Sequence, residues 1–597
     1  MAFLSGFIDY ARVYNKAVAD EMLLQAKEEI FWNESKESFL GINKRPLFED
    51  DKIAVWVEGK IVNINNAKDV ASLFMDKKEE CFKYFDGSFI LIILDKYGDF
   101  LYIVRDKAGI EPFYYFKTQN RFIFSSSLKK FYSYPFFKKE IDLDSLALFL
   151  QYGYIAHPYS IYKNTFKLSP ASYLKIDFRK KNFQEFSYWN ILKFYNEKID
   201  MDENEIIDKS EELLFKAVEK RFSLSLSPKG SFLSGGYDSA AISLILSRIS
   251  SKKIATYTIG FYEKGYDEAP FAKKIADIIA SDHHEFYFSC DDAKTVMDSV
   301  AEIYNEPFGD KAALPTIFLS KKASKDIKEI FSGEGGDEVF ATAGDMKLFL
   351  KLNKIPFFLR KTVSSLMKEV PLSVIEKFSF TNFSTRYEKW SNLLGKKDIV
   401  NFIKFKEQVM GISEIQKLFL KNISFKEPYF KEKGFEQIVE KENFLDAMLG
   451  VYFNIYMSND ELVKVSQALT YFNIRLYEPF LDKKLIEFLA QVPVSLKQKY
   501  SVEKYILKKI VHKYIPQEIM NRPKKGFSVP LDRWLRKGLS FYIETYLGRE
   551  RIEREEIFDF YEVERIKKEF FSGKNEYTKR IWLLLMFEMW YERQSAL

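Results

Sequence analysis

One short run of residues limits what this chain can fold into: Ser234-Gly235-Gly236-Tyr237-Asp238-Ser239. It follows the apolar segment 231–233 and precedes the apolar run 240–246. This order predicts a strand, a turn of small residues and then a helix. Backbone N–H groups converge at such a helix start, where the helix dipole favours an anion. Asp238 would repel that anion unless a cation lies between them, so the run also indicates Mg²⁺.

The run differs from the phosphate loop of kinases and GTPases, which needs Gly-Lys followed by Ser or Thr. The Gly-Lys pairs of this chain are followed by Ile61, Lys397 and Asn575. Instead, the run resembles the pyrophosphate loop of ATP-pyrophosphatases, which cleave ATP to AMP and PPi. The alternative is a surface turn that caps a helix, which would fit an isolated Ser-Gly-Gly better than the full run.

The length and charge of the chain narrow the classes of protein further. A chain of 597 residues should form two or more domains, and 47% hydrophobic residues should give them packed cores. A formal charge of +6 gives no reason to expect a nucleic-acid partner. Two cysteines, Cys81 and Cys290, fit a reducing cytoplasm. Neither a membrane span nor a signal peptide is expected.

The pattern of residues predicts two domains, 1–195 and 204–597, joined by a polar linker. The first is rich in predicted strands at 53–57, 89–94, 100–104 and 121–124, with helices at 21–31 and 143–152. In the second, predicted strands at 230–233, 255–261 and 327–331 alternate with helical runs, which favours a parallel α/β sheet. From about residue 347 the pattern is mostly helical and ends with a helix at 577–592.

A second glycine-rich run, Ser332-Gly333-Glu334-Gly335-Gly336-Asp337-Glu338, follows the predicted strand 327–331. Ligands of open α/β sheets bind outside the carboxyl ends of the strands. Asp238 and Asp337 should both lie at such ends and could share one Mg²⁺. Two ordinary strand–helix turns are the alternative, although glycines on both sides of Glu334 cost stability unless the backbone must bend or approach a neighbour.

Further runs in the second domain carry a resemblance to the asparagine synthetase family of the class B type. They are Tyr257-Thr258-Ile259-Gly260-Phe261, Glu306-Pro307-Phe308-Gly309-Asp310, Asp460-Glu461-Leu462-Val463-Lys464, Pro479-Phe480-Leu481-Asp482 and the loop 522–530, RPKKGFSVP. With the two glycine-rich runs they form an ordered set that covers nearly the whole chain. The resemblance implies an α/β ATP-pyrophosphatase (PP-loop) synthetase domain with a helical C-terminal part.

The resemblance also implies which residues carry the chemistry. The loop residues would hold PPi: Ser234, Gly235, Gly236, Asp238 and Ser239. Others would border the adenosine of ATP: Leu233, Ile259, Ser332 and Gly333. Asp238 and Asp337 would hold Mg²⁺, Glu334 would help to deprotonate the amine, and Lys524 would stabilise charge on the phosphates and the tetrahedral intermediate.

One segment departs from the family pattern. The family places one residue between an arginine and Pro-Phe-Leu-Asp, whereas here Leu476-Tyr477-Glu478 separates Arg475 from Pro479. Ser466 also stands where an acidic residue is expected after Lys464. We therefore expect the acceptor side of the substrate pocket to be remodelled.

The first domain resembles the family's glutaminase-type (Ntn-type) αββα sandwich, through residues 105–115 and 124–128. In glutamine-dependent members the second residue is a cysteine whose thiol attacks glutamine and whose α-amine acts as base. Here that residue is Ala2, and Cys81 is internal. The family's Asn-Gly oxyanion pair appears as Glu58-Gly59, and a carboxylate would repel an oxyanion. We expect an inactive scaffold.

These patterns together predict an AMP-forming carbon–nitrogen ligase that adenylates a carboxylate and transfers it to an amine without hydrolysing glutamine. The substrate would be a small molecule or peptide that carries both groups. The most specific hypothesis is macrolactam formation in a lasso-type peptide, since family relatives without the cysteine, such as β-lactam synthetases and lasso-peptide cyclases, use an amine of the substrate. A leader-peptide-binding protein or protease would then be a partner. The alternatives are an ammonia-dependent asparagine synthetase and a non-catalytic ATP-binding regulatory relative.

Overall fold

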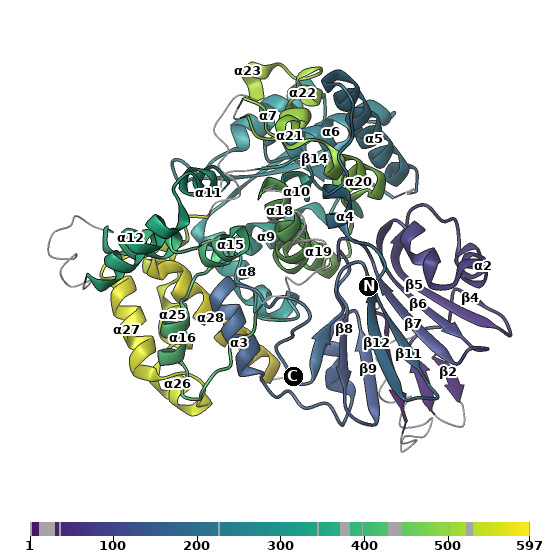
Figure 1. Ribbon diagram of the computed structural model, residues 1–597, viewed down its shortest axis with the longest axis horizontal. Helices are drawn as coiled ribbons and strands as arrows, with labels where there is room; N and C mark the ends of the chain where they lie inside the picture. The colour runs from purple at the N-terminus through teal and green to yellow at the C-terminus, as the bar shows by residue number, and fades with distance from the viewer. Residues whose placement is uncertain are drawn as a thin grey trace.

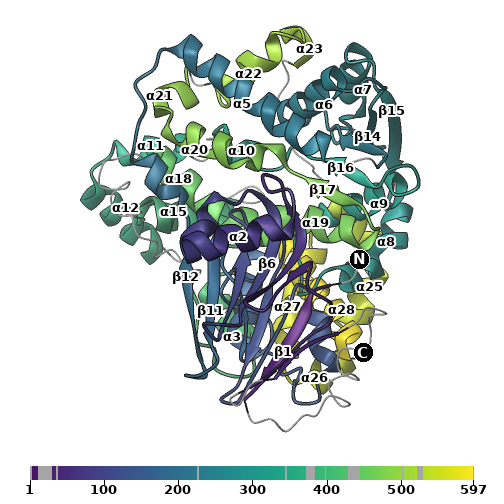
Figure 2. The ribbon, with the colours of Figure 1, turned by 90° about the vertical axis from the view of Figure 1, so that its right-hand side faces the viewer.

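The computed structural model describes residues 3–10, 30–34, 38–224, 227–342, 346–370, 383–396, 398–427, 444–500, 502–520 and 529–595. Its N-terminal part is a sandwich of two sheets, its middle part is built on a parallel sheet, and its C-terminal part is helical (Figure 1). Helix α2 (Ala67–Lys77) lies on the outside of the sandwich in the rotated view (Figure 2).

Each sheet of the sandwich has six strands, and the pairings within it are antiparallel. The first runs in the order β10 (Thr165–Lys167), β8 (Tyr114–Lys117), β9 (Arg121–Ser125), β1 (Ser5–Asp9), β3 (Phe39–Ile42), β2 (Phe31–Glu34). The second runs β12 (Asn182–Ser187), β11 (Ser172–Asp177), β7 (Phe100–Arg105), β6 (Gly87–Asp95), β5 (Ile53–Ile61), β4 (Phe48–Glu49).

The residues of β6 alternate between two cores, as the period of two of a strand requires. Ile90 and Ile92 pack in the core between the two sheets, whereas Leu91 and Ile93 pack with Phe74 of α2 on the other face. Strand β6 is therefore apolar along almost its whole length, because both of its faces are covered.

The third sheet has five parallel strands in the order β15 (Asp282–Phe288), β14 (Ala255–Phe261), β13 (Lys229–Phe232), β16 (Glu329–Phe331), β17 (Arg475–Tyr477). Chain order reverses direction between the adjacent strands β13 and β16. Such a reversal opens a crevice at the carboxyl ends of the two strands, which is where α/β sheets of this kind bind ligands.

Helix α5 (Glu203–Ser223) precedes β13, and the helices that follow β13 are α6 (Tyr237–Ile249), α7 (Ala269–Ile278), α8 (Cys290–Ile303), α9 (Ala313–Ala323) and the short α10 (Gly336–Val339). Those that bear on the site and the interface in the C-terminal part are α15 (Ile399–Glu407), the π-helical segment η3 (Tyr452–Glu461), α19 (Leu462–Tyr471), α22 (Tyr505–His512) and α28 (Tyr577–Ser595). No helix among the described residues is long and apolar enough to cross a membrane.

The remaining described helices are α3 (Leu143–Tyr152) and α4 (Ile191–Tyr195), then α11 (Met346–Asn353), α12 (Phe357–Glu369), α14 (Phe383–Leu394), α16 (Ile412–Leu418), α18 (Phe444–Val451), α20 (Lys483–Gln491), α21 (Val494–Lys497), α23 (Gln517–Met520), α24 (Leu531–Arg536), α25 (Ser540–Tyr546), α26 (Arg549–Glu555) and α27 (Phe560–Phe571). Short 3₁₀ segments are η1 (Lys78–Tyr84), η2 (Leu128–Ser133) and η4 (Pro479–Leu481).

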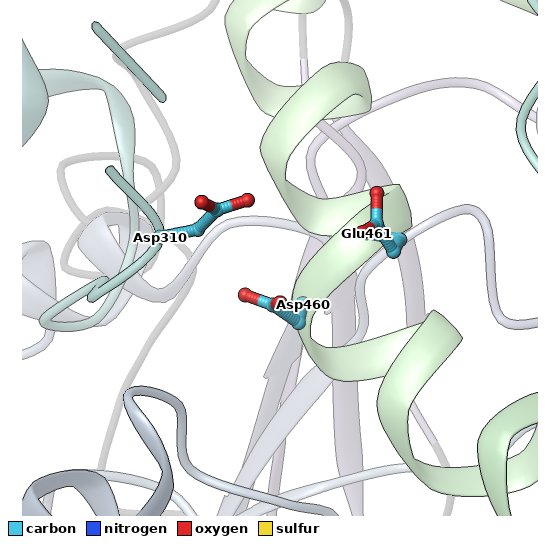
Figure 3. A group of neighbouring side chains, drawn as sticks. All are labelled: Asp310, Asp460 and Glu461. Carbon is cyan, nitrogen blue, oxygen red and sulfur yellow. The ribbon is translucent and has the colours of Figure 1, made fainter. Parts of the chain in front are cut away.

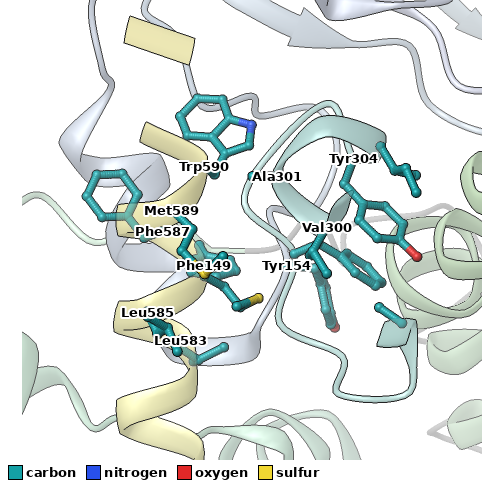
Figure 4. Packing of buried hydrophobic residues seen from close by; sticks show 14 of the residues in the cluster. Phe149, Tyr154, Val300, Ala301, Tyr304, Leu583, Leu585, Phe587, Met589 and Trp590 are labelled. Atoms are coloured by element: carbon teal, nitrogen blue, oxygen red, sulfur yellow. The ribbon is translucent and has the colours of Figure 1, made fainter. Parts of the chain in front are cut away.

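An apolar core joins the sandwich to the rest of the molecule. Phe149 of α3 packs in one cluster with Val300 of α8 and with Leu583 and Met589 of α28 (Figure 4). Burial of side chains of this size stabilises by about 1.5–3 kcal/mol each. The two halves are therefore held by a shared core as well as by the covalent linker.

Most expected elements are present, but one expected helix was wrong at its end and several strands were missed. Helix α3 has the expected bounds, with Asp142 accepting from Ser145 N at its start and Gly153 in the left-handed region at its end. The expected helix 21–31 was wrong at Phe31, which begins strand β2, and its residues 21–29 lie outside the described ones. Strands β15 and β17 were missed, since β15 is polar and β17 has only three residues. The sandwich strands β1, β2, β3, β4, β8, β10, β11 and β12 were also not predicted individually.

Candidate active site

The loop after β13 leaves the first amides of α6 available to a ligand. Gly235 has φ +78°, a left-handed conformation that favours glycine. Gly236 is the N-cap of α6 and supplies no side-chain hydrogen bond to its first turn. Ser239 Oγ accepts from Ser234 N at 3.1 Å, which closes the loop on itself. Uncapped amides at a helix start form a site for phosphate oxygens.

The second glycine-rich loop touches the first, and glycine makes the approach possible. A Cβ on Gly333 would lie 2.9 Å from Ser239 N, and one on Gly336 would lie 2.7 Å from Asp238 Cγ. Real Cβ atoms essentially never come so close, so larger residues at either position would push the loops apart. This contact brings Asp238 and Asp337 to the same end of the sheet.

A lysine that sequence reasoning missed lies between these two carboxylates. Lys504 Nζ is 2.5 Å from Asp238 Oδ1 and 2.9 Å from Asp337 Oδ1. Lys504 is buried and has φ +53° at the start of α22. Burial alone would lower the pKa of Lys504, but the two carboxylates raise it above its usual value. The ammonium is therefore a permanent positive charge beside the phosphate loop.

The donor set around Lys504 also fits Mg²⁺. Asp238 and Asp337 both reach a single cation, and carboxylate oxygens are ligands that Mg²⁺ prefers. When bound, Mg²⁺ would neutralise charge on the phosphates.

Glu334 has the environment of a weak acid that can act as a base near neutral pH. Burial, together with the carboxylate of Glu461, raises the pKa of Glu334 to about 8, and the ammonium of Lys464 limits the rise. Its Oε1 lies 3.5 Å from Ser332 Oγ. A carboxylate with a pKa near 8 is basic enough to accept a proton from an amine at a pH close to neutral.

Three acidic residues lie together, namely Asp310, Asp460 and Glu461 (Figure 3), and Glu461 also interacts with Glu334. Their ligand atoms lie within 4.8 Å of one another. Lys464 Nζ pairs with two of them, at 3.0 Å from Asp310 Oδ2 and 2.7 Å from Glu461 Oε2. Because the ammonium of Lys464 already balances part of this negative charge, the three acids position Lys464 at the wall of the cavity.

One cavity of about 490 Å³ connects these parts. Every predicted site residue that the structure describes lines it: Leu233, Ser234, Gly235, Gly236, Asp238, Ser239, Ile259, Ser332, Gly333, Glu334 and Asp337. Their roles stay predictions. Lys524 lies outside the described residues. Lys464, Lys504 and Lys508 also line the cavity and were not identified from the sequence as site residues.

The departures from the family pattern were expected to remodel the acceptor side of the substrate pocket, but they lie elsewhere. Ser466 and Arg475 do not line the 490 Å³ cavity. They line a separate cavity of about 400 Å³ between the sandwich and α19, together with Glu58 and Glu111. Arg475 begins the edge strand β17, with its side chain 3.8 Å from Glu329. The departure from the family pattern therefore faces the N-terminal domain.

Glu58 occupies a hydrogen-bonding position near the start of the chain. Its Oε2 accepts from Leu4 N at 2.8 Å and from Ser126 Oγ at 2.7 Å. Burial raises the pKa of Glu58, and these two hydrogen bonds oppose the rise. Burial and the neighbouring Glu58 raise the pKa of Glu111 to about 8. Two donors thus hold the Glu58 carboxylate in place.

The fold and the site define a class of protein: an Ntn-type amidotransferase domain followed by a PP-loop synthetase domain. A family model described as asparagine synthase matches residues 209–592, and one described as a glutamine amidotransferase domain matches residues 53–189. The chain belongs to the asparagine synthase family, which indicates a carbon–nitrogen ligase.

Three relatives illustrate the similarity. A Methanocaldococcus jannaschii protein, described as a candidate glutamine-hydrolysing asparagine synthetase, is 36% identical over 48% of this chain and 56% of its own length. Glutamine-hydrolysing asparagine synthetase 1 of Bacillus subtilis is 24% identical over 90% of this chain and 82% of its own. A Mycobacterium bovis protein, again a candidate asparagine synthetase, is 24% identical over 85% of this chain and 76% of its own.

Proposed function

We propose that this protein is an ATP-dependent ligase that adenylates a carboxylate, releases PPi and transfers the acyl group to an amine. The observation that carries the proposal is the convergence of two acid-bearing loops on Lys504 at the crevice between β13 and β16. That arrangement supplies amides, an ammonium and carboxylates to a triphosphate at a single point. Membership of the asparagine synthase family supports ATP as the nucleotide.

The chemistry divides among residues as follows. A substrate carboxylate oxygen attacks the α-phosphorus, the bond to the β-phosphate breaks, and PPi leaves into the loop of Ser234–Ser239. Lys504 balances the charge that grows on the leaving group. Glu334 then takes a proton from the attacking amine, and AMP leaves as the amide forms. Lys524 would assist charge stabilisation, as its place in the basic loop 522–530 predicts.

We propose further that the amine does not come from glutamine. Glu58 supports this, because its carboxylate takes the hydrogen bonds of Leu4 N and Ser126 Oγ. Ala2, the second residue of the sequence, provides no thiol. The specific form that we favour is macrolactam closure in a lasso-type peptide, with a leader-peptide-binding protein or protease as partner. Ammonia-dependent asparagine synthesis is the second candidate, favoured by the names of the relatives.

A product assay separates these forms. The protein is incubated with ATP, Mg²⁺ and either L-aspartate plus ammonium chloride or a peptide that carries a free N-terminus and an internal carboxylate. PPi release and amide formation are followed together. Aspartate-dependent asparagine would favour the second candidate, and loss of one water from the peptide would favour cyclisation. Release of ADP and phosphate with either substrate would contradict adenylation itself.

A further inference from the structure

A second chamber of about 350 Å³ opens beside the 490 Å³ cavity and shares Gly333, Glu334 and Asp337 with it. Its far wall comes from the helical part of the chain: Glu407 at the end of α15, and Tyr452 and Tyr456 of the π-helical segment η3. π-Helical turns inside longer helices often occur at functional sites. We call this space the acidic chamber.

Five of the residues that line the acidic chamber are carboxylic acids: Glu334, Asp337, Glu338, Glu407 and Glu461. No lysine, arginine or histidine is among the described residues that line it. A substrate carboxylate that entered the chamber would meet a lining with several acidic side chains and no basic ones among the described residues. A positively charged group would instead meet several carboxyl oxygens at once.

The five carboxyls differ in whether a lysine outside the chamber pairs with them. Glu461 pairs with Lys464 at 2.7 Å, and Asp337 pairs with Lys504 at 2.9 Å. Glu407 accepts from Tyr452 OH at 3.3 Å and lies 3.6 Å from Lys406 Nζ.

Glu338 differs from its neighbours. It is only 8% exposed, and no ion pair or side-chain hydrogen bond to its carboxyl joins it to the other described residues. Its own backbone N–H and the charge of Lys504 stabilise this carboxyl only in part, and a cation bound in the chamber would offset more of the cost of its burial.

The aromatic part of the wall suits the same kind of ligand. The rings of Tyr452 and Tyr456 are 5.9 Å apart and nearly perpendicular, and both residues line the chamber. A ring face attracts a cation that lies within about 6 Å of its centre. Met448 and Leu449 add apolar surface for the carbon chain that would carry the charge.

We infer that the acidic chamber binds a cationic group of the substrate, an ammonium or guanidinium, next to the carboxylate that is adenylated. The substrate is then a carboxylic acid or peptide that also carries an amino or guanidino group. The inference rests on the proposed function, because it takes the neighbouring cavity as the adenylation site. Glu338 and Glu407 are the residues that would decide this specificity.

The test measures binding of agmatine, a dication without a carboxylate, by isothermal titration calorimetry. Succinate is the anionic comparison. We expect agmatine to bind the wild-type protein and succinate not to bind. Glu407→Gln and Glu338→Gln should each weaken agmatine binding about tenfold or more, as expected for loss of one charge-assisted contact. Glu427→Gln, at an exposed glutamate, is the matched control and should change nothing.

Two outcomes would overturn the inference: no agmatine binding to the wild type, or equal affinity in the wild type and Glu407→Gln. Glu407→Gln keeps the test valid if Glu338→Gln fails to fold. ATP binding is titrated in parallel with the same samples. If ATP binds normally and Glu407→Gln leaves the affinity for agmatine unchanged, only this inference is refuted. If the wild type does not bind ATP, the proposed function is refuted.

Discussion

The ammonium of Lys504 lies 2.5 Å from Oδ1 of Asp238, although the two residues are 266 positions apart in the chain. The same nitrogen is 2.9 Å from Asp337, so a single lysine ties together the two loops that face the cavity. Removal of one partner from a buried pair costs about 3–5 kcal/mol, because the remaining charge is left unpaired. Lys504 therefore connects the stability of this domain with its chemistry.

Lys504→Met should lower both activity and melting temperature. The rate of PPi release should fall by about 10²-fold or more, as for loss of one preorganised positive group at a developing charge. Mg²⁺ should raise the Tm of the variant more than that of the wild type, because it can replace the ammonium between the carboxylates. Lys509→Ala, at an exposed residue of the same helix, is the control. An unchanged rate in Lys504→Met would contradict this role.

Asp238→Asn and Asp337→Asn should each abolish PPi release while circular dichroism stays native. Both carboxylates face the phosphate loop and are the residues fitted to hold Mg²⁺. Asp277→Asn, whose side chain is 63% exposed, should retain full activity. Near-normal release by either site variant would show that the two acids do not share a cation during the reaction.

Lys524→Ala should reduce the rate steeply with little change in Tm, and Lys525→Ala should be mild. Both residues lie in the loop 522–530, outside the described part, so this prediction depends on the sequence. Arginine at 524 should be a poor substitute, because its planar fork does not reproduce a compact ammonium. Equal losses in the two alanine variants would mean that the loop acts only as a basic surface.

The pH dependence should reveal Glu334 as the base. Its pKa is raised to about 8, and only the deprotonated carboxylate can accept a proton, so kcat/KM for amide formation should rise from pH 7 to pH 9 with a midpoint near 8. Glu461, Lys464 and Asp337 are the charged groups that act on it. Glu334→Gln should be slow at every pH and lack this step. A midpoint that survives in Glu334→Gln would assign it to another group.

Glutamine should not be hydrolysed. Glutamate release from glutamine should stay at the level without enzyme, and Ala2→Cys alone should not restore it, because Glu58 still holds the donors Leu4 N and Ser126 Oγ. The double variant Ala2→Cys/Glu58→Asn is the informative comparison. Glutaminase activity in the unaltered protein would refute the reading of the sandwich as a scaffold.

The sequence revealed the parts of the site that follow strand ends, because local order of strand, glycine-rich turn and helix encodes them. Ser234, Asp238, Glu334 and Asp337 were found in this way, and all line one cavity. Lys504 was not found, since only the path of the chain brings α22 to α6. No local signal marks it, because its neighbours resemble an ordinary polar turn.

The error at Arg475 has a related cause. The departure from the family pattern was visible in the sequence, but the cavity that it faces depends on how β17 packs at the sheet edge against the sandwich. The acidic chamber has the same origin. Glu407 and Tyr452 come from separate helices, and their meeting with the second glycine-rich loop is a property of the tertiary structure.

The most direct test of adenylation is to identify the nucleotide product. We would monitor the reaction by ³¹P NMR with Mg²⁺, ATP and a panel of amino-bearing carboxylic acids and peptides. AMP and PPi should accumulate in equal amounts with the wild type and should be absent with Asp238→Asn. Formation of ADP and phosphate, or AMP formation that Asp238→Asn leaves intact, would contradict the central claim.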